Sequence, residues 1–213
     1  IEKGGKVLAG FDCGPANTLL DLSCRVLFSE PYDKDAKIAS TGRVRKDWLY
    51  ELLTHPYLKR DFPKSSGRED FNENTVKKYL NLVKNQEASG ADLLATLCEF
   101  SVKAVIDEII KIKEHFKNLK EGDLILCGGG AYNPLIKQRF EEYCRNLNLN
   151  VMLSDEVGIH PVYMEAEAFA WFTYMCINGK PIDLTHSTGA KYPTILGCLC
   201  PAPNGNFVKS RLK

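Results

Sequence analysis

The sequence predicts an α/β fold from three observations. A short apolar run over residues 123–127 precedes three glycines, an amphipathic segment over residues 133–144 and a second apolar run over residues 150–153. A strand, a helix and a strand within about 30 residues form a crossover unit whose two strands are parallel. The chain also opens with a strand followed by a helix, and no internal repeat or low-complexity segment interrupts the pattern. The predicted fold class is therefore α/β.

The first elements follow from local signals. Residues 6–11 have the composition of a strand that ends at Asp12, and Asn17 is placed to cap the next helix. The apolar positions of that helix share one face and are Leu19, Leu20, Leu22 and Val26. A second helix is predicted over residues 48–53. The charged stretch 59–72 contains a proline and a glycine, which favour an ordered loop.

Two further helices are predicted outside the crossover unit. Ser89 begins the longest helix, with Asp92 in the capping-box position, and apolar residues recur at helical spacing as far as Phe116. Residues 164–177 form another helix, which is apolar almost throughout. A helix that is apolar on all sides is expected to be buried.

Composition excludes several classes of protein. The 213 residues include 28 basic and 27 acidic side chains, and the net charge of +1 gives no general attraction to nucleic acid. No apolar stretch approaches the ~18 residues that span a bilayer, so no membrane partner and a cytoplasmic location are expected. The eight cysteines include no Cys-x-x-Cys pair and are expected to be reduced. No cysteine and histidine set has zinc spacing, so no metal ligands are predicted.

Asp12 is the first candidate for chemistry. It ends a predicted strand and precedes a glycine turn and a helix, which is where open α/β sheets bind ligands. The free amides of that helix start favour a phosphate, and the carboxylate could act as a general base on a hydroxyl or water. Alternatively, Asp12 only caps the turn, and the residues alone leave the two explanations equally open. An aspartic protease is not indicated, because no second such triplet exists.

Gly128, Gly129 and Gly130 are the second candidate site. Three glycines after a buried strand let the flat face of a nucleotide lie against the backbone, and a tight structural turn is the alternative. The string matches neither the dinucleotide-binding nor the Walker pattern. Asn133 needs no role beyond that of a helix cap.

Two weaker signals complete the set of candidates. Glu165 and Glu167 lie in the first turn of the apolar helix, where the helix dipole favours carboxylates. That explanation has the greater weight for Glu167, whereas Glu165 could instead bind a sugar hydroxyl. The charged string over residues 64–69 alone is typical of a solvated loop.

Together and in this order, these segments resemble the anhydro-N-acetylmuramic acid kinase family. The matching strings are Gly-Phe-Asp-Cys-Gly-Pro-x-Asn at 10–17, Lys-Ser-Ser-Gly-Arg-Glu at 64–69, Cys-Gly-Gly-Gly-Ala-x-Asn at 127–133, Glu-x-x-Ala-Phe-Ala-Trp at 165–171, Thr-Gly-Ala at 188–190 and Leu-Gly at 196–197. The resemblance runs from Gly10 to Pro201, which is nearly the whole chain.

The resemblance implies a fold and an activity. The fold would be an actin-like ATPase lobe, related to ribonuclease H, with a mixed sheet and helices on both faces. The activity would be that of a kinase using ATP and Mg²⁺, in which Asp12 activates water to open an anhydro sugar while the released oxygen takes the γ-phosphoryl group. The other implied site residues are Gly14, Asn17, Gly128, Gly129, Gly130 and Asn133 for the nucleotide and Glu165 for the sugar. Levoglucosan kinase is a close relative, and the sequence does not choose between the two sugars.

The resemblance also implies a missing part. Family members have an amino-terminal lobe with a phosphate loop rich in glycine, threonine and serine, and this chain contains no counterpart. The chain begins at Ile1 without a methionine, so residues 1–200 are expected to be the carboxyl-terminal lobe, followed by a polar tail over 201–213. The chain alone is then expected to be inactive. A homodimer stays open, as do a lobe that binds a nucleotide or partner without catalysis and an enzyme that uses Cys13.

Overall fold

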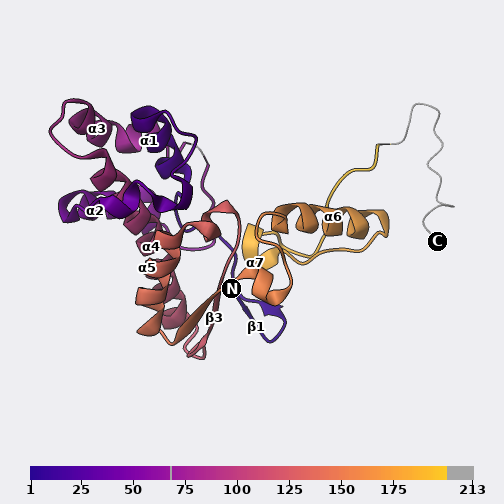
Figure 1. Cartoon of the computed structure of the whole chain (residues 1–213). Helices are drawn as coiled ribbons and strands as arrows, with labels where there is room; N and C mark the ends of the chain where they lie inside the picture. Colours follow the sequence, from indigo (N-terminus) through magenta and orange to yellow (C-terminus); the bar gives the residue numbers. More distant parts are fainter. Residues whose placement is uncertain (68, 201–213) are drawn as a thin grey trace. The chain divides into compact units, whose positions relative to one another are not determined.

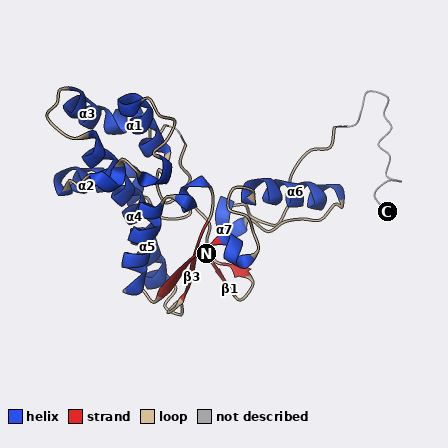
Figure 2. Ribbon diagram, in the orientation of Figure 1, coloured by secondary structure: helices blue, strands red, loops and turns tan. Residues whose placement is uncertain are grey.

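The chain forms two compact units. The computed structural model describes residues 1–67 and 69–200 (Figure 1). The larger unit is Phe11–Met164, and the smaller one combines Ile1–Gly10 with the chain from Glu165 onward. Each unit has its own elements, and helices predominate in both (Figure 2).

The larger unit is built around one long helix. Its helices and strands are α1 (Thr18–Phe28), α2 (Lys46–Leu53), α3 (Glu73–Lys84), α4 (Gly90–His115), β3 (Gly122–Leu126), α5 (Pro134–Arg145) and β4 (Leu149–Leu153). Short 3-10 turns cover Lys34–Ala36, Ala39–Thr41, Pro56–Lys59, Gly129–Tyr132 and Ser154–Val157. Helix α4 contacts α1, α2, α3 and α5 and is the central element of the unit.

The core of this unit follows from the sequence of α4. Leu93, Leu94, Leu97 and Phe100 are fully buried, because neighbouring helices surround this apolar-rich half of the helix. Burial of each such side chain contributes about 1.5–3 kcal/mol to folding. The predicted core helix is confirmed. Its cap differs in one detail: the Ser89 hydroxyl accepts from Ala91 N, but Asp92 accepts from Arg43 N at 2.8 Å and completes no capping box.

The crossover unit is confirmed. Strands β3 and β4 are parallel, with Leu124 opposite Val151, and α5 lies between them in sequence and packs on β4 and α4. The expectation that the first strand of this unit is buried is wrong, since no residue of β3 is buried. A sheet of two strands cannot enclose either strand, and Ile125 remains 43% exposed.

The described strands form no single mixed sheet with helices on both faces. The predicted strand over residues 6–11 is limited to β2 (Lys6–Val7), which pairs antiparallel with β1 (Glu2–Lys3). Gly4 and Gly5 both have positive φ and form the tight turn between them. Within the described ranges, residues 8–11 belong to no strand.

The smaller unit contains the apolar helix α6 (Met164–Ile177). The helix forms where it was predicted, but the prediction that it is buried is wrong, because none of its residues is buried. Besides α6, the described part of this unit has only the β1–β2 hairpin, the four-residue α7 (Thr185–Thr188) and a bridge between Ile182 and Thr194. These elements are too few to enclose a helix on all sides.

Two general expectations concern thiols and membranes. All eight cysteines are free, although only Cys24, Cys98 and Cys144 are buried. Across residues 1–67 and 69–200, no helix combines the length and the apolar character needed to cross a membrane. The predicted polar tail, 201–213, lies outside the described residues.

Candidate active site

Asp12 lies where two distant segments of the larger unit meet. Its Oδ2 atom accepts hydrogen bonds from the backbone N of Ser66 at 2.8 Å and from Ser65 Oγ at 3.2 Å. No hydrogen bond within the described part of the chain reaches its Oδ1 atom. Ser65 and Ser66, from the string with the weak signal, therefore belong to the same site as Asp12, which the sequence alone did not indicate.

Asp12 lines a hollow of about 290 Å³. The residues that line it are Asp12, Gly14, Pro15, Thr18, Ser66, Gly67 and Phe71. A Cβ atom on Gly14 would lie 2.9 Å from Cβ of Ala104, so glycine lets this turn pack tightly on α4. The carboxylate is thus exposed to the hollow while its backbone rests on the core.

The backbone of Asp12 is also held on both sides. Its N–H donates to the carbonyl oxygen of Lys64 at 3.2 Å, and its own carbonyl accepts from the Tyr57 hydroxyl at 2.7 Å. Burial raises the pKa of the Tyr57 hydroxyl to about 12, and the nearby negative charge of Asp12 acts in the same direction. The hydroxyl is therefore protonated at neutral pH and remains a donor.

A buried ion pair involves Lys64, which directly precedes the two serines that donate to Asp12. Lys64 Nζ is 2.8 Å from Glu108 Oε1, and both side chains are 3% exposed. Lys64 Nζ also donates to the carbonyl of Arg60 at 3.0 Å, and the half-exposed Lys111 approaches the same Glu108 oxygen at 2.7 Å. Sequence reasoning missed Tyr57 and Glu108. A glutamate on the apolar face of α4 was the one available signal for Glu108.

The thiol next to Asp12 is neutral. The pKa of Cys13 is raised to about 11, first by burial and then by the charge of Glu108. The nucleophilic form of cysteine is the thiolate, which is scarce at neutral pH when the pKa is this high. This finding counts against an enzyme that uses Cys13.

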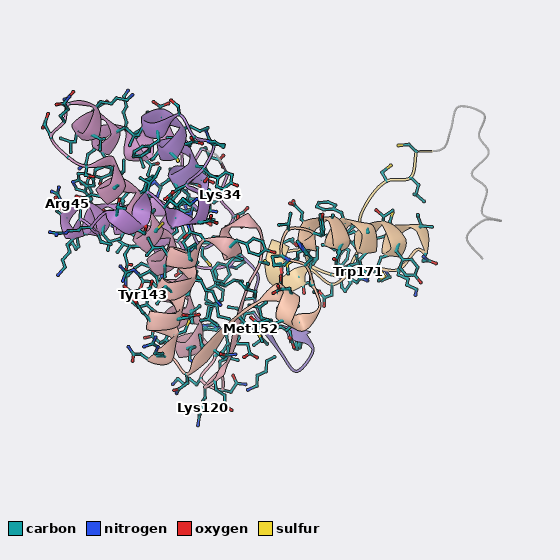
Figure 3. The ribbon with its side chains drawn as sticks, viewed as in Figure 1. Lys34, Arg45, Lys120, Tyr143, Met152 and Trp171 are labelled. Carbon is teal, nitrogen blue, oxygen red and sulfur yellow. The ribbon has the colours of Figure 1, made fainter. Side chains whose placement is uncertain are left out.

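A second hollow of about 380 Å³ brings together several residues predicted to bind the nucleotide. Its lining comprises Asn17, Leu20, Asp21, Tyr32, Asp33, Lys34, Asp35, Gly129, Tyr132, Asn133 and Val162, and Figure 3 labels Lys34. Tyr32 and Tyr132 are 53% and 47% exposed and offer aromatic faces. Neither tyrosine stands out in the sequence, because both are isolated aromatic residues in loops or turns.

Asn17 differs from its predicted role. It occupies the N-cap position of α1, but its side chain accepts no capping hydrogen bond. Its amide instead lies against the glycine turn: a Cβ atom on Gly130 would be 2.8 Å from Asn17 Nδ2. The amide is therefore placed at the wall of the hollow, and Gly130 makes the space for it.

The remaining glycine-turn residues have separate structural roles. Gly128 has φ +78°, a conformation that favours glycine, and begins the turn over Gly129–Tyr132. No atom lies within 4 Å of a Cβ built on Gly129, so this glycine faces open space. The Asn133 side chain accepts from the backbone N of Leu135 and of Ile136, both at 3.1 Å, and caps α5 as predicted.

Glu165 belongs to the smaller unit, unlike the other predicted site residues. It lies in the first turn of α6 and is exposed. Among the residues with described positions, no group of three or more His, Cys, Asp or Glu side chains is arranged to hold a metal ion.

Comparison with known proteins identifies the family. Residues 2–202 match the family described as anhydro-N-acetylmuramic acid kinase. A protein of that name from Coxiella burnetii (strain Dugway 5J108-111) is 39% identical over 91% of this chain and 50% of its own length. The protein of that name from Vibrio vulnificus (strain YJ016) is 38% identical over 90% of this chain and 50% of its own length. The one from Shewanella baltica is 35% identical over 88% of this chain and 48% of its own length. The chain thus spans about half the length of the curated relatives it matches, and over that half it belongs to the anhydro-N-acetylmuramic acid kinase family.

Proposed function

We propose that this chain is the lobe of an ATP-dependent anhydro-sugar kinase that carries the catalytic base and the adenosine site. The observation that carries the proposal is the arrangement around Asp12: one carboxylate oxygen is fixed by two donors, and the other faces a hollow. A general base needs this combination of fixed orientation and a free acceptor atom. The actin-like fold and a cytoplasmic location are part of the same proposal, on the strength of family membership.

Asp12 acts on water in the proposed mechanism. Its Oδ1 atom takes a proton from a water molecule as the oxygen of that water bonds to the anomeric carbon of the sugar. The bond between that carbon and the bridging oxygen breaks. The bridging oxygen then bonds to the γ-phosphorus of ATP as the bond from that phosphorus to ADP breaks, and ADP leaves. Ser65 and Ser66 hold the carboxylate in position throughout, and the neutral Cys13 thiol adds no competing negative charge.

The 380 Å³ hollow fits the adenosine portion of ATP. Tyr32 and Tyr132 offer aromatic faces to a purine ring, and Gly129 leaves the backbone accessible. Asn17 would donate its amide to the nucleotide, and the start of α1, which no side chain caps, would favour a phosphate. When bound, ATP would supply the phosphoryl group, and Mg²⁺ would neutralise its charge. Mg²⁺ is commonly held by phosphates with one or two carboxylates, so a dedicated protein cage is not required.

The remaining components come from family membership. Glu165 would bind a sugar hydroxyl, and the sugar would be anhydro-N-acetylmuramic acid or levoglucosan. A second lobe would supply the phosphate loop and the other wall of the cleft, because phosphoryl transfer needs donors around the transferred group. A homodimer remains compatible with this proposal.

The family-length protein is this chain joined to the proposed second lobe. In that protein, the replacement Asp12→Asn tests the role of the base. We expect turnover to fall by about 10²–10⁴-fold, because the amide cannot accept the proton, while ATP affinity measured by calorimetry changes little. Asp123→Asn, which alters an exposed carboxylate on β3, is the matched control and should leave turnover unchanged. An equal loss of ATP affinity and of turnover in the Asp12 variant would refute the assignment.

A second candidate function is nucleotide binding without catalysis. One observation favours it: both hollows are formed by residues of the larger unit alone, so binding does not require a second lobe. Under this alternative, the family-length protein would bind ATP but would show no sugar-dependent ADP release, with or without the Asp12 replacement.

A further inference from the structure

We infer that the buried Lys64–Glu108 pair is a positioning device for Asp12, an inference that rests on the proposed role of Asp12 as the base. The pair anchors the segment 64–66 to α4, and this segment supplies both donors to Asp12 Oδ2. Neither Lys64 nor Glu108 touches the 290 Å³ hollow, so each acts on the carboxylate only through that segment.

The segment needs an anchor because nothing regular holds it in place. Within the described residues, 61–67 belong to no helix or strand, so no backbone ladder fixes the two donors. Lys64 supplies the anchor with three contacts: its Nζ reaches Glu108 Oε1 and the Arg60 carbonyl, and it lies 5.2 Å from the centre of the Tyr57 ring. A buried ammonium has few alternative positions, since any movement would leave its charge unpaired.

The anchor acts on the backbone of Asp12 as well as on its carboxylate. The Lys64 carbonyl accepts from the Asp12 N–H, and Tyr57, whose ring packs beside the Lys64 ammonium, donates to the Asp12 carbonyl. One buried lysine is therefore connected to four of the hydrogen bonds that set the place and direction of Asp12. A carboxylate that must meet a water and a sugar carbon in line is sensitive to small displacements.

The carboxylate of Glu108 is buried with only one of its two oxygens hydrogen-bonded in the portion of the chain that the structure describes, which suits a positioning role. Its Oε1 atom accepts from Lys64 and Lys111, whereas its Oε2 atom is buried and has no hydrogen-bond partner among the described residues. A carboxylate satisfied on one oxygen only is costly to bury, and a purely structural contact at this position would be served better by apolar side chains.

The double replacement Lys64→Met with Glu108→Met tests the inference on the 213-residue chain. Two apolar residues of similar length leave no buried charge unpaired, and the half-exposed Lys111 keeps its hydrogen bond to the Leu58 carbonyl, so the fold is expected to persist. We expect the Ser66 amide to exchange with deuterium at least roughly tenfold faster by NMR, because the segment that carries this donor is no longer anchored to α4. Asp12→Ala, which removes the acceptor, gives the upper limit of this rate. Lys137→Met with Glu141→Met removes an exposed ion pair on α5 and should leave the Ser66 rate unchanged.

A kinetic measurement separates positioning from mere stability. In the family-length protein, the double Met variant should lose about 10²-fold in kcat with KM unchanged, because substrate contacts remain while the base is misplaced. Glu108→Gln, which keeps the shape of the side chain, should also raise the Ser66 exchange rate and lower kcat, but by less than the double variant does.

The result that overturns the inference is an unchanged Ser66 exchange rate in both the double variant and Glu108→Gln. That result would leave the role of Asp12 intact. A turnover that survives Asp12→Asn would instead refute the proposed function, whatever the Ser66 amide does.

Discussion

Cys13 shows how one residue can be chemically silent beside the proposed base, Asp12. Desolvation disfavours its thiolate, and the charge of Glu108 adds to the effect, so its pKa is raised to about 11. The thiol is protonated below that pH and becomes reactive only as the pH rises through it.

Alkylation by iodoacetamide provides a test of this pKa. We expect Cys13 to react slowly at pH 7.5, with a rate that increases about tenfold per pH unit until it levels off near pH 11. The exposed Cys127 serves as an internal reference for mass spectrometry. Labelling of Cys13 at neutral pH as fast as that of Cys127 would contradict the raised pKa of Cys13.

The candidate site shows what single residues do and do not reveal in sequence. Asp12 and Asn17 could be proposed from their place after a strand and before a helix. The contributions of Tyr57 and Glu108 could not, because they depend on contacts with Asp12 and Lys64 across more than forty residues of chain. Local patterns contain no information about such pairings.

At the scale of elements, the starts of α1 and α5 differ although an asparagine occupies each N-cap. Asn133 bonds to two backbone N–H groups of α5, whereas Asn17 bonds to none of α1. We therefore expect Asn133→Ala to lower the free energy of unfolding by about 1 kcal/mol, as loss of a helix cap does.

Asn17→Ala is the matched comparison. It should change stability by less than about 0.5 kcal/mol but weaken nucleotide binding, because its amide lies at the wall of the 380 Å³ hollow. Urea unfolding and calorimetry on the same two variants decide the point. A larger loss of stability from Asn17→Ala than from Asn133→Ala would contradict the observed caps.

Elements with strong local signals were predicted well. The crossover unit and α4 were found because apolar spacing and turn residues agree in those segments. Helix α3 was missed, although Asn72 and Thr75 form a capping box and Val76, Tyr79 and Leu80 are buried at helical spacing. Its high proportion of lysine and asparagine hid that spacing. The burial of α6 was predicted wrongly because burial depends on neighbours, which composition does not specify.

At the scale of the whole molecule, the chain is shorter than its relatives but contains both candidate binding hollows. The chain spans about half of its curated relatives, yet both hollows form within its larger unit. We therefore expect the 213-residue chain to bind ATP in a calorimeter but to release no ADP when an anhydro sugar is added. Sustained ADP release from the purified chain would show that no second lobe is needed.

The placement of the two tryptophans has a practical consequence for following the molecule in solution. Trp48 is 5% exposed, packs on Tyr79 with ring centres 5.0 Å apart, and lies beneath Arg45 in the larger unit. Trp171, labelled in Figure 3, is 48% exposed on α6 of the smaller unit. One indole emits from a dry aromatic environment and the other from water, so their fluorescence spectra separate. Each unit therefore contains its own optical reporter, and Trp171→Phe would leave a single reporter, Trp48, in the core of the larger unit.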